Sequence, residues 1–285
     1  MRVPHTVGAP SAEIPVRFPA VASLVVLCLL LPASRLHAAP GPEALYGHLS
    51  LGYGGWSQRD MNGYLGDIAA SARESGAAHV DRTRFGGSPA FAGELGYRAS
   101  EWVSFGFAGS FEAAKRGVTA RGPTDFMGNP VYMTDASDWT LSLFEVTGNL
   151  TMWLPLGAEA PGAGLGRASL FLGANVGLCA GVADATERID VSGYGASSYE
   201  GIWAGVGPAI GVFAGGQIDS PTGFLGFAKV GYHHRTMKHL KGDVTSDGST
   251  LHDVRLDDLT ERSTTLDFSG VYVLLGVGFT IHTGH

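Results

Sequence analysis

Apolar side chains recur at every second position in eight segments of the chain. In the segment from Glu101 to Glu112, Val103, Phe105 and Phe107 alternate with small or polar residues. Successive side chains of a strand point to opposite faces, so this period predicts strands with one apolar and one small or polar face. The predicted strands cover residues 45–57, 89–98, 101–112, 138–153, 168–183, 201–216, 223–235 and about 264–282.

The segment GIWAGVGPAIGVFAGG, Gly201 to Gly216, carries no charge and fits either a membrane helix or a strand. Most of its glycines occupy odd positions, whereas its isoleucines and valines occupy even ones. A helix needs about 20 apolar residues to cross a bilayer, and a tilted strand about 9 to 11. The length therefore favours a strand, with a bulge expected at Pro208 because proline cannot donate to a ladder.

A second bulge is expected near Leu143, where the apolar positions change parity. Trp139, Leu141 and Leu143 are apolar at odd positions, and Phe144 and Val146 continue the pattern at even ones. An extra residue in the strand would restore a single apolar face.

The connections between the predicted strands alternate in length. Those at 58–88, 113–137, 184–198 and 236–262 are long and polar, and those at 99–100, 155–167 and 216–222 are shorter. This asymmetry is typical of an outer-membrane barrel, with long loops outside the cell and both termini in the periplasm. In lipid every backbone polar group must be hydrogen-bonded within the protein, and a closed barrel is the arrangement of strands that achieves this.

The first long connection contains a helical pattern. Asp60 is placed to cap a helix in which Met61, Leu65 and Ile68 share one face, and Gly76 is placed to end it. We expect a short surface helix over the mouth of the barrel.

The N-terminus has the pattern of a secretory signal peptide. Arg2 and Arg17 precede the apolar run from Val21 to Pro32, and small residues follow. We expect cleavage after Ala38, which divides the chain into a signal peptide at 1–38 and an outer-membrane β-barrel domain at 39–285. The net charge of −7 argues against nucleic-acid binding.

Several charged residues fall on the small and polar faces of the predicted strands. A narrow barrel interior imposes a large desolvation cost on unpaired charges, so we expect a salt-bridge network, with Lys229 beside Glu145. A gated ion path is the alternative. The interior charges are Glu94, Arg98, Glu112, Glu145, Lys229, His233 and Arg235.

Other candidate chemistry is weak. His48 and Ser50 share a strand face as in outer-membrane lipid A deacylases, but they are expected to point inward. The histidines and aspartates of 236–262 follow no EF-hand spacing, and a solvated acidic loop is the simpler interpretation. We expect no catalytic, cofactor-binding or metal site, and no cofactor.

The leader, the eight alternating segments, the glycine-rich SLGYGGW and the apolar GVYVLLGVGF resemble the small OmpA/OmpX-like outer-membrane β-barrel family. The family usually ends on an aromatic residue, whereas here TIHTGH follows Phe279. The pattern and the resemblance together indicate an all-β fold: an eight-stranded antiparallel transmembrane β-barrel with a short helix in the first extracellular loop. A lipocalin-like soluble barrel is less consistent, because lipocalins place their apolar residues inside.

The expected function is that of a non-enzymatic outer-membrane barrel of a Gram-negative bacterium, with a structural and surface-interaction role. A narrow, porin-like pore or a conduit for small hydrophobic ligands is the alternative, and a lipid-modifying outer-membrane enzyme is the third. The expected partners are outer-membrane lipids, lipopolysaccharide, the barrel-assembly machinery and a surface partner held by the extracellular loops, with no nucleic acid.

Overall fold

The computed structural model describes residues 44–126, 128–156, 167–220, 222–260 and 263–282. The predicted signal peptide at 1–38 and its cleavage site lie outside the described residues. All described residues belong to one unit of the chain, His37–His285.

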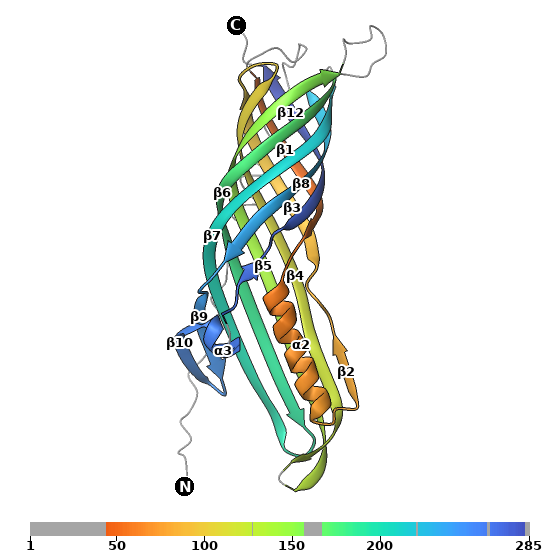
Figure 1. The fold of residues 1–285 in the computed structure, drawn as a ribbon, viewed down its shortest axis with the longest axis vertical. Coiled ribbons are helices and arrows are strands. Elements are labelled where there is room, and N and C mark those ends of the chain that lie inside the picture. The colour runs from red at the N-terminus through yellow and green to blue at the C-terminus, as the bar shows by residue number, and fades with distance from the viewer. Residues whose placement is uncertain (1–43, 127, 157–166, 221, 261–262, 283–285) are drawn as a thin grey trace. The chain divides into compact units, whose positions relative to one another are not determined.

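Antiparallel strands make up most of the described chain, which confirms the prediction of an all-β antiparallel fold (Figure 1). The helices are α2 (Arg59–Glu74) and α3 (Leu256–Thr260). The strands are β1 (Ala44–Gly55), β2 (His79–Arg82), β3 (Gly87–Arg98), β4 (Val103–Phe126), β5 (Asn129–Leu156), β6 (Ala168–Val191), β7 (Gly195–Asp219), β8 (Phe224–Met237), β9 (Lys241–Ser246), β10 (Ser249–Arg255), β11 (Leu266–Asp267) and β12 (Gly270–His282). The described residues thus hold twelve strands, where the alternation predicts eight.

Eight of these strands close a ring. Each strand pairs with the next in the order β1, β3, β4, β5, β6, β7, β8, β12, and β12 pairs with β1 again. A closed ladder leaves no free edge, so the wall satisfies its own backbone hydrogen bonds. In the described residues, no helix is long and apolar enough to cross a membrane.

Four strands continue past the ring as a sheet extension, formed by residues 113–126 of β4, 129–143 of β5, 181–191 of β6 and 195–208 of β7. The β3–β4 ladder ends at Glu112, and the β7–β8 ladder begins at Ala209. Beyond these points β2 pairs with β4, and β9 pairs with β7 (Figure 1).

The prediction that residues 113–137 and 184–198 form loops is therefore wrong, because these residues are mostly strand. Gly128, just before β5, and Gly193, between β6 and β7, lie in the left-handed region at φ values of 79° and 84°. The connection at 236–262 also contains regular structure, namely β9, β10 and α3.

The apolar face of β5 changes sides without a bulge. The β4–β5 and β5–β6 registers run unshifted past Leu143, so the bulge predicted there is wrong. In the extension Trp139 and Leu141 point inward and are buried, whereas in the ring Phe144 and Val146 point outward and are exposed. The parity changes because the core lies inside the extension, while the apolar surface of the ring lies outside.

The bulge predicted at Pro208 is also wrong. Pro208 pairs with Leu178 in an unshifted β6–β7 register. Residues 205–208 of β7 lie between the segments that pair with β9 and with β8, so they have a ladder on one side only. Proline is tolerated at such a position, as on an edge strand.

Helix α2 lies along the inner face of the sheet extension (Figure 1). Met61, Leu65 and Ala69 are fully buried on one face of α2, in a core that also contains Trp139 and Trp203. The rings of these two tryptophans stack with centroids 5.7 Å apart. The helix predicted from the sequence exists, but it is a core helix and not a surface one.

The predicted ends of α2 are correct at one end only. Gly76 follows the helix with a φ of 87°, as expected of a residue that ends it. The N-cap is Gln58 and makes no side-chain capping bond, so Asp60 is not the cap. Asp60 instead accepts a hydrogen bond from the backbone N–H of Thr265, at 3.0 Å.

Leu65→Ala should lower the free energy of unfolding by about 2 to 5 kcal/mol, because it opens a cavity beneath α2. The matched control is Leu251→Ala on β10, where the side chain is 64% exposed and the expected loss is below about 0.5 kcal/mol. Urea unfolding followed by tryptophan fluorescence measures both. Equal losses in the two variants would mean that α2 does not pack as described.

Candidate functional site in the interior of the ring

The two faces of the ring wall differ in chemistry. The outer face carries large apolar side chains that are exposed, such as Phe107 at 75% and Val277 at 69%. On β7, Val206 and Ile210 point outward and Gly207 and Gly211 inward, as the sequence predicts. The inner face holds the polar and charged residues of the wall, which makes it the candidate site.

Arg235, near the end of β8, is the centre of an arginine cluster with Glu112, Glu145 and His233. Its side chain is 1% exposed, and its Nη1 atom lies 2.6 Å from Glu112 Oε1 and 3.0 Å from Glu145 Oε2. Its Nε and Nη2 atoms donate to the carbonyl oxygen of Phe268, at 3.2 and 2.9 Å. Both carboxylates and a carbonyl therefore converge on one guanidinium, a group that presents several donors in a fixed plane.

Neighbouring polar groups complete the arginine cluster. Trp56 donates its indole N–H to Glu112 Oε2 at 2.5 Å, and Ser110 donates to Glu145 at 3.4 Å. His233 Nδ1 lies 3.3 Å from Glu145 Oε2, and His233 Nε2 lies 2.9 Å from Asn175 Nδ2. Glu112 and Glu145 thus share one arginine, and His233 lies against the second of these carboxylates.

Lys229 lies in a second group, the lysine cluster, with Glu94 and His48. Lys229 Nζ lies 3.0 Å from Glu94 Oε2, and His48 Nε2 lies 3.5 Å from the same oxygen. Tyr46 donates its hydroxyl to Glu94 Oε1 at 2.9 Å. The pairing of Lys229 with Glu145 expected from the sequence is wrong, because Glu145 is occupied by Arg235 and His233.

Arg98 forms no ion pair with a carboxylate of either cluster among the described residues. Its guanidinium carbon lies 4.1 Å from the ring centroid of Trp153, close enough for a cation–π contact. Six of the seven interior residues predicted from the sequence are thus brought together in two clusters, and the seventh is buried elsewhere on the inner face.

The sequence reasoning missed Tyr46 and Trp56, although a signal for both exists. Tyr46 lies in β1 and Trp56 directly follows it, and both have the same even parity as His48, which places them on the inner face. Tyr46 reaches Glu94 across Gly96, where a Cβ atom would collide with the tyrosine ring. The glycine is therefore part of the site, because it leaves room for the ring.

A small cavity of about 40 Å³ lies between the two clusters. Among the described residues, His48 Nδ1 and Asn175 Oδ1, both buried in residues that line the cavity, have no hydrogen-bond partner. A water molecule needs roughly 10 to 15 Å³ of such volume. The cavity therefore suits a few waters bridging the clusters, and it is too small for a larger ligand.

His48 and Ser50 both point inward but do not hydrogen-bond to each other in the described structure. Ser50 donates to the carbonyl oxygen of Ala92 at 3.3 Å, and the imidazole of His48 lies against Glu94. In the acidic connection, His239 lies beside Asp257 and His252 beside Asp243. The described residues contain no group of three or more histidines, cysteines or acids placed to hold a metal ion.

Comparisons with known proteins give a distant likeness. No family model and no curated protein matches the chain. A crystal structure of Ail, the attachment invasion locus protein of Yersinia pestis, in complex with the heparin analogue sucrose octasulfate matches with 12% identity and a TM-score of 0.34, covering 85% of this chain and 100% of that one. A second crystal structure of Ail matches with 13% identity and a TM-score of 0.33, with the same coverage. At these values the likeness carries no conclusion about family, ligand or function.

Lys229→Met should lower the free energy of unfolding by about 3 to 5 kcal/mol, because it leaves Glu94 buried without its main partner. Adding Glu94→Gln should recover much of that loss, whereas adding Glu145→Gln should not, since Glu145 belongs to the arginine cluster. Urea unfolding of the single and double variants measures the coupling. Recovery by Glu145→Gln in place of Glu94→Gln would overturn the described pairing.

Proposed function

We propose that this chain is a non-enzymatic outer-membrane β-barrel that anchors the sheet extension at the bacterial surface. The observation that carries this proposal is the arrangement of the ring, in which large apolar side chains cover the outside, while the charged side chains of the wall point inward beside a buried aromatic cluster. A water-soluble protein rarely exposes a continuous apolar surface larger than a few hundred Å². A lipid bilayer around the ring accounts for the exposed apolar outer face.

The dimensions of the ring support a membrane position. β1 and β3 are each 12 residues long, and a tilted strand needs about 9 to 11 residues to cross a bilayer. Trp102 and Tyr97 lie exposed at the end of the ring with the short turns, where membrane barrels carry aromatic girdles. The expected contacts are therefore with outer-membrane lipids and lipopolysaccharide. The signal peptide would direct export, and the barrel-assembly machinery would insert the protein.

The orientation follows from where the connections lie. The sheet extension, α2 and the β9–β10 hairpin lie at the end of the ring opposite the short turns, and in outer-membrane barrels the larger connections face outward. We place the sheet extension outside the cell, where it is available to a surface partner.

The interior favours an anchor over the alternatives. The 40 Å³ cavity and the two paired clusters support a filled bore over a narrow pore or a hydrophobic-ligand conduit. The inward direction of His48 and the bond of Ser50 to a backbone carbonyl support the non-enzymatic role over lipid modification.

A pair of lysine substitutions tests the membrane position. Leu275, on the outer face of β12, and Leu251, on β10, are 62% and 64% exposed. Leu275→Lys should lower the stability of the protein in phospholipid vesicles by roughly 2 to 4 kcal/mol, as for lysine near a bilayer midplane. Leu251→Lys should have little effect, because its surroundings are aqueous.

Urea unfolding in vesicles, read by the loss of heat-modifiable gel mobility, measures both lysine variants. Equal tolerance at the two positions would contradict the membrane proposal, since a residue facing water accepts lysine readily.

Purified wild-type protein in planar bilayers should show conductance near background, because ion-paired side chains occupy the bore. The control is the same preparation denatured by boiling before reconstitution. Reproducible single-channel steps from the folded protein alone would favour the narrow-pore alternative.

A further inference from the structure

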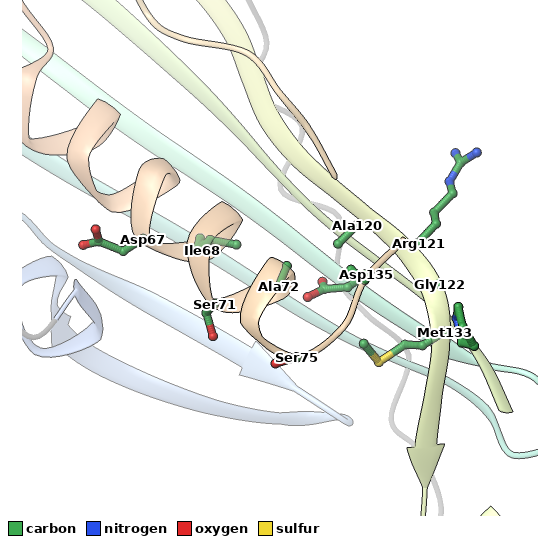
Figure 2. Close-up of a pocket in the computed structure, with 12 residues that line it drawn as sticks. Asp67, Ile68, Ser71, Ala72, Ser75, Ala120, Arg121, Gly122, Met133 and Asp135 are labelled. Atoms are coloured by element: carbon green, nitrogen blue, oxygen red, sulfur yellow. The ribbon is translucent and has the colours of Figure 1, made fainter. Parts of the chain in front are cut away.

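A pocket of about 360 Å³ lies between the C-terminal half of α2 and the adjoining parts of β4 and β5 (Figure 2). Most of its surface is apolar and comes from residues such as Ile68, Ala72, Pro123 and Met133. Its volume falls within the range of pockets that bind small molecules, about 300 to 1,000 Å³. The pocket is separate from the interior of the ring.

Asp135 of β5 contributes a carboxylate to this pocket. Its Oδ1 atom is buried and has no hydrogen-bond partner among the described residues. The residues opposite Asp135 in the sheet, Ala120 and Ile189, have no charge. A buried carboxylate oxygen without a partner is costly, and a bound donor would remove that cost.

A second carboxylate increases the negative charge beneath α2. Glu187 of β6 is half-buried, and its register partner on β5 is Ser137, two residues from Asp135 on the same face. Burial raises the pKa of Glu187, and the charge of Asp135 raises it further. Burial also raises the pKa of Asp135.

The described chain supplies no cation to these two carboxylates. Arg121 also borders the pocket, but Figure 2 shows its side chain directed away from Asp135. Neither Asp135 nor Glu187 forms an ion pair among the described residues, whereas Asp138, on the opposite face of β5, pairs with Lys115 at 2.9 Å. The local charge therefore complements a positively charged ligand.

We propose that this pocket binds a small organic amine, with its ammonium group on Asp135 and its carbon chain against Ile68, Ala72 and Met133. A hard divalent cation is a poorer match, because it takes six or more oxygen ligands and has no use for apolar walls. The inference deepens the proposed function and rests on it in one respect: because the sheet extension is placed outside the cell, the amine is an extracellular one.

Three five-carbon probes test the proposal on the full-length folded protein in non-ionic detergent, by isothermal titration calorimetry. They are cadaverine, 1,5-pentanediol and glutarate, which all have five carbons and end in ammonium groups, hydroxyl groups and carboxylates respectively. Cadaverine should bind with one molecule per chain, and the neutral and anionic probes should not bind.

Asp135→Asn should weaken cadaverine binding about ten-fold or more, because it replaces a charge-assisted hydrogen bond by a neutral one. It keeps the size of the side chain and removes an uncompensated charge, so the variant should fold. Ala72→Phe should abolish binding, because the larger side chain fills the pocket. The matched control is Asp138→Asn, with the same change on the same strand but the other face, and it should bind cadaverine as the wild type does.

Absence of cadaverine binding would overturn the proposal, and so would unchanged affinity in Asp135→Asn. Equal binding of pentanediol would show an apolar pocket without selectivity for cations, and loss of cadaverine binding on addition of Mg²⁺ at constant ionic strength would show a metal site. These measurements use purified protein, so they fail or succeed independently of the lysine test of membrane position.

Discussion

The closure of the hydrogen-bond ladder from β12 back to β1 is the constraint on which the rest of the structure depends. A strand at the edge of an open sheet must find water or another chain for its backbone groups. β1 and β12 would be the two edges of the wall if it were open. They pair with each other along their length, as at Tyr53 and Val273, so neither strand has that requirement. The outer face can then be apolar along its whole length, because no backbone group there needs water.

Closure also determines what the interior must contain. The inner faces of eight strands enclose a narrow space, in which an isolated charge would lose its hydration without gaining a partner. The arginine and lysine clusters meet this requirement with contacts between distant parts of the chain, since Glu94 and Lys229 are 135 residues apart. The pairing also explains why so many hydroxyl and ring groups gather around the carboxylates, each providing a further hydrogen bond.

The period of the side chains was enough to predict the ring, but it was not enough to predict the sheet extension. Phe105 and Phe107 face outward as their alternation indicates, because one face of the ring is uniformly apolar. In the extension the inner face of β4 is built from small residues such as Ala114 and Ala120, and its outer face is polar, so the alternation is weak and these strands resemble a loop. The parity change at Leu143 suggested a bulge because a single sequence gives no sign that the core moves from outside to inside.

The ion pairs within the site could not be predicted from the sequence either. Parity places Lys229, Glu94 and Glu145 on the inner face, but which charges meet depends on how the strands are ordered and staggered around the ring. The pocket at Asp135 depends on α2 lying inside the sheet extension, whereas the helical pattern alone predicted a helix on the surface.

If the ring lies in a bilayer, as proposed, the change of apolar face between Leu143 and Phe144 determines how deep the protein sits. β5 runs through this point as one strand with an unshifted register, so the distance along the strand between its outward-facing apolar residues and its core-facing residues is fixed. If the strand sank further into the membrane, the polar outer face of the sheet extension would enter hydrocarbon, and if it rose, Phe144 and Val146 would enter water. In the proposed placement, the height at which the sheet extension stands above the membrane is therefore set by the covalent continuity of β5 and not by a hinge.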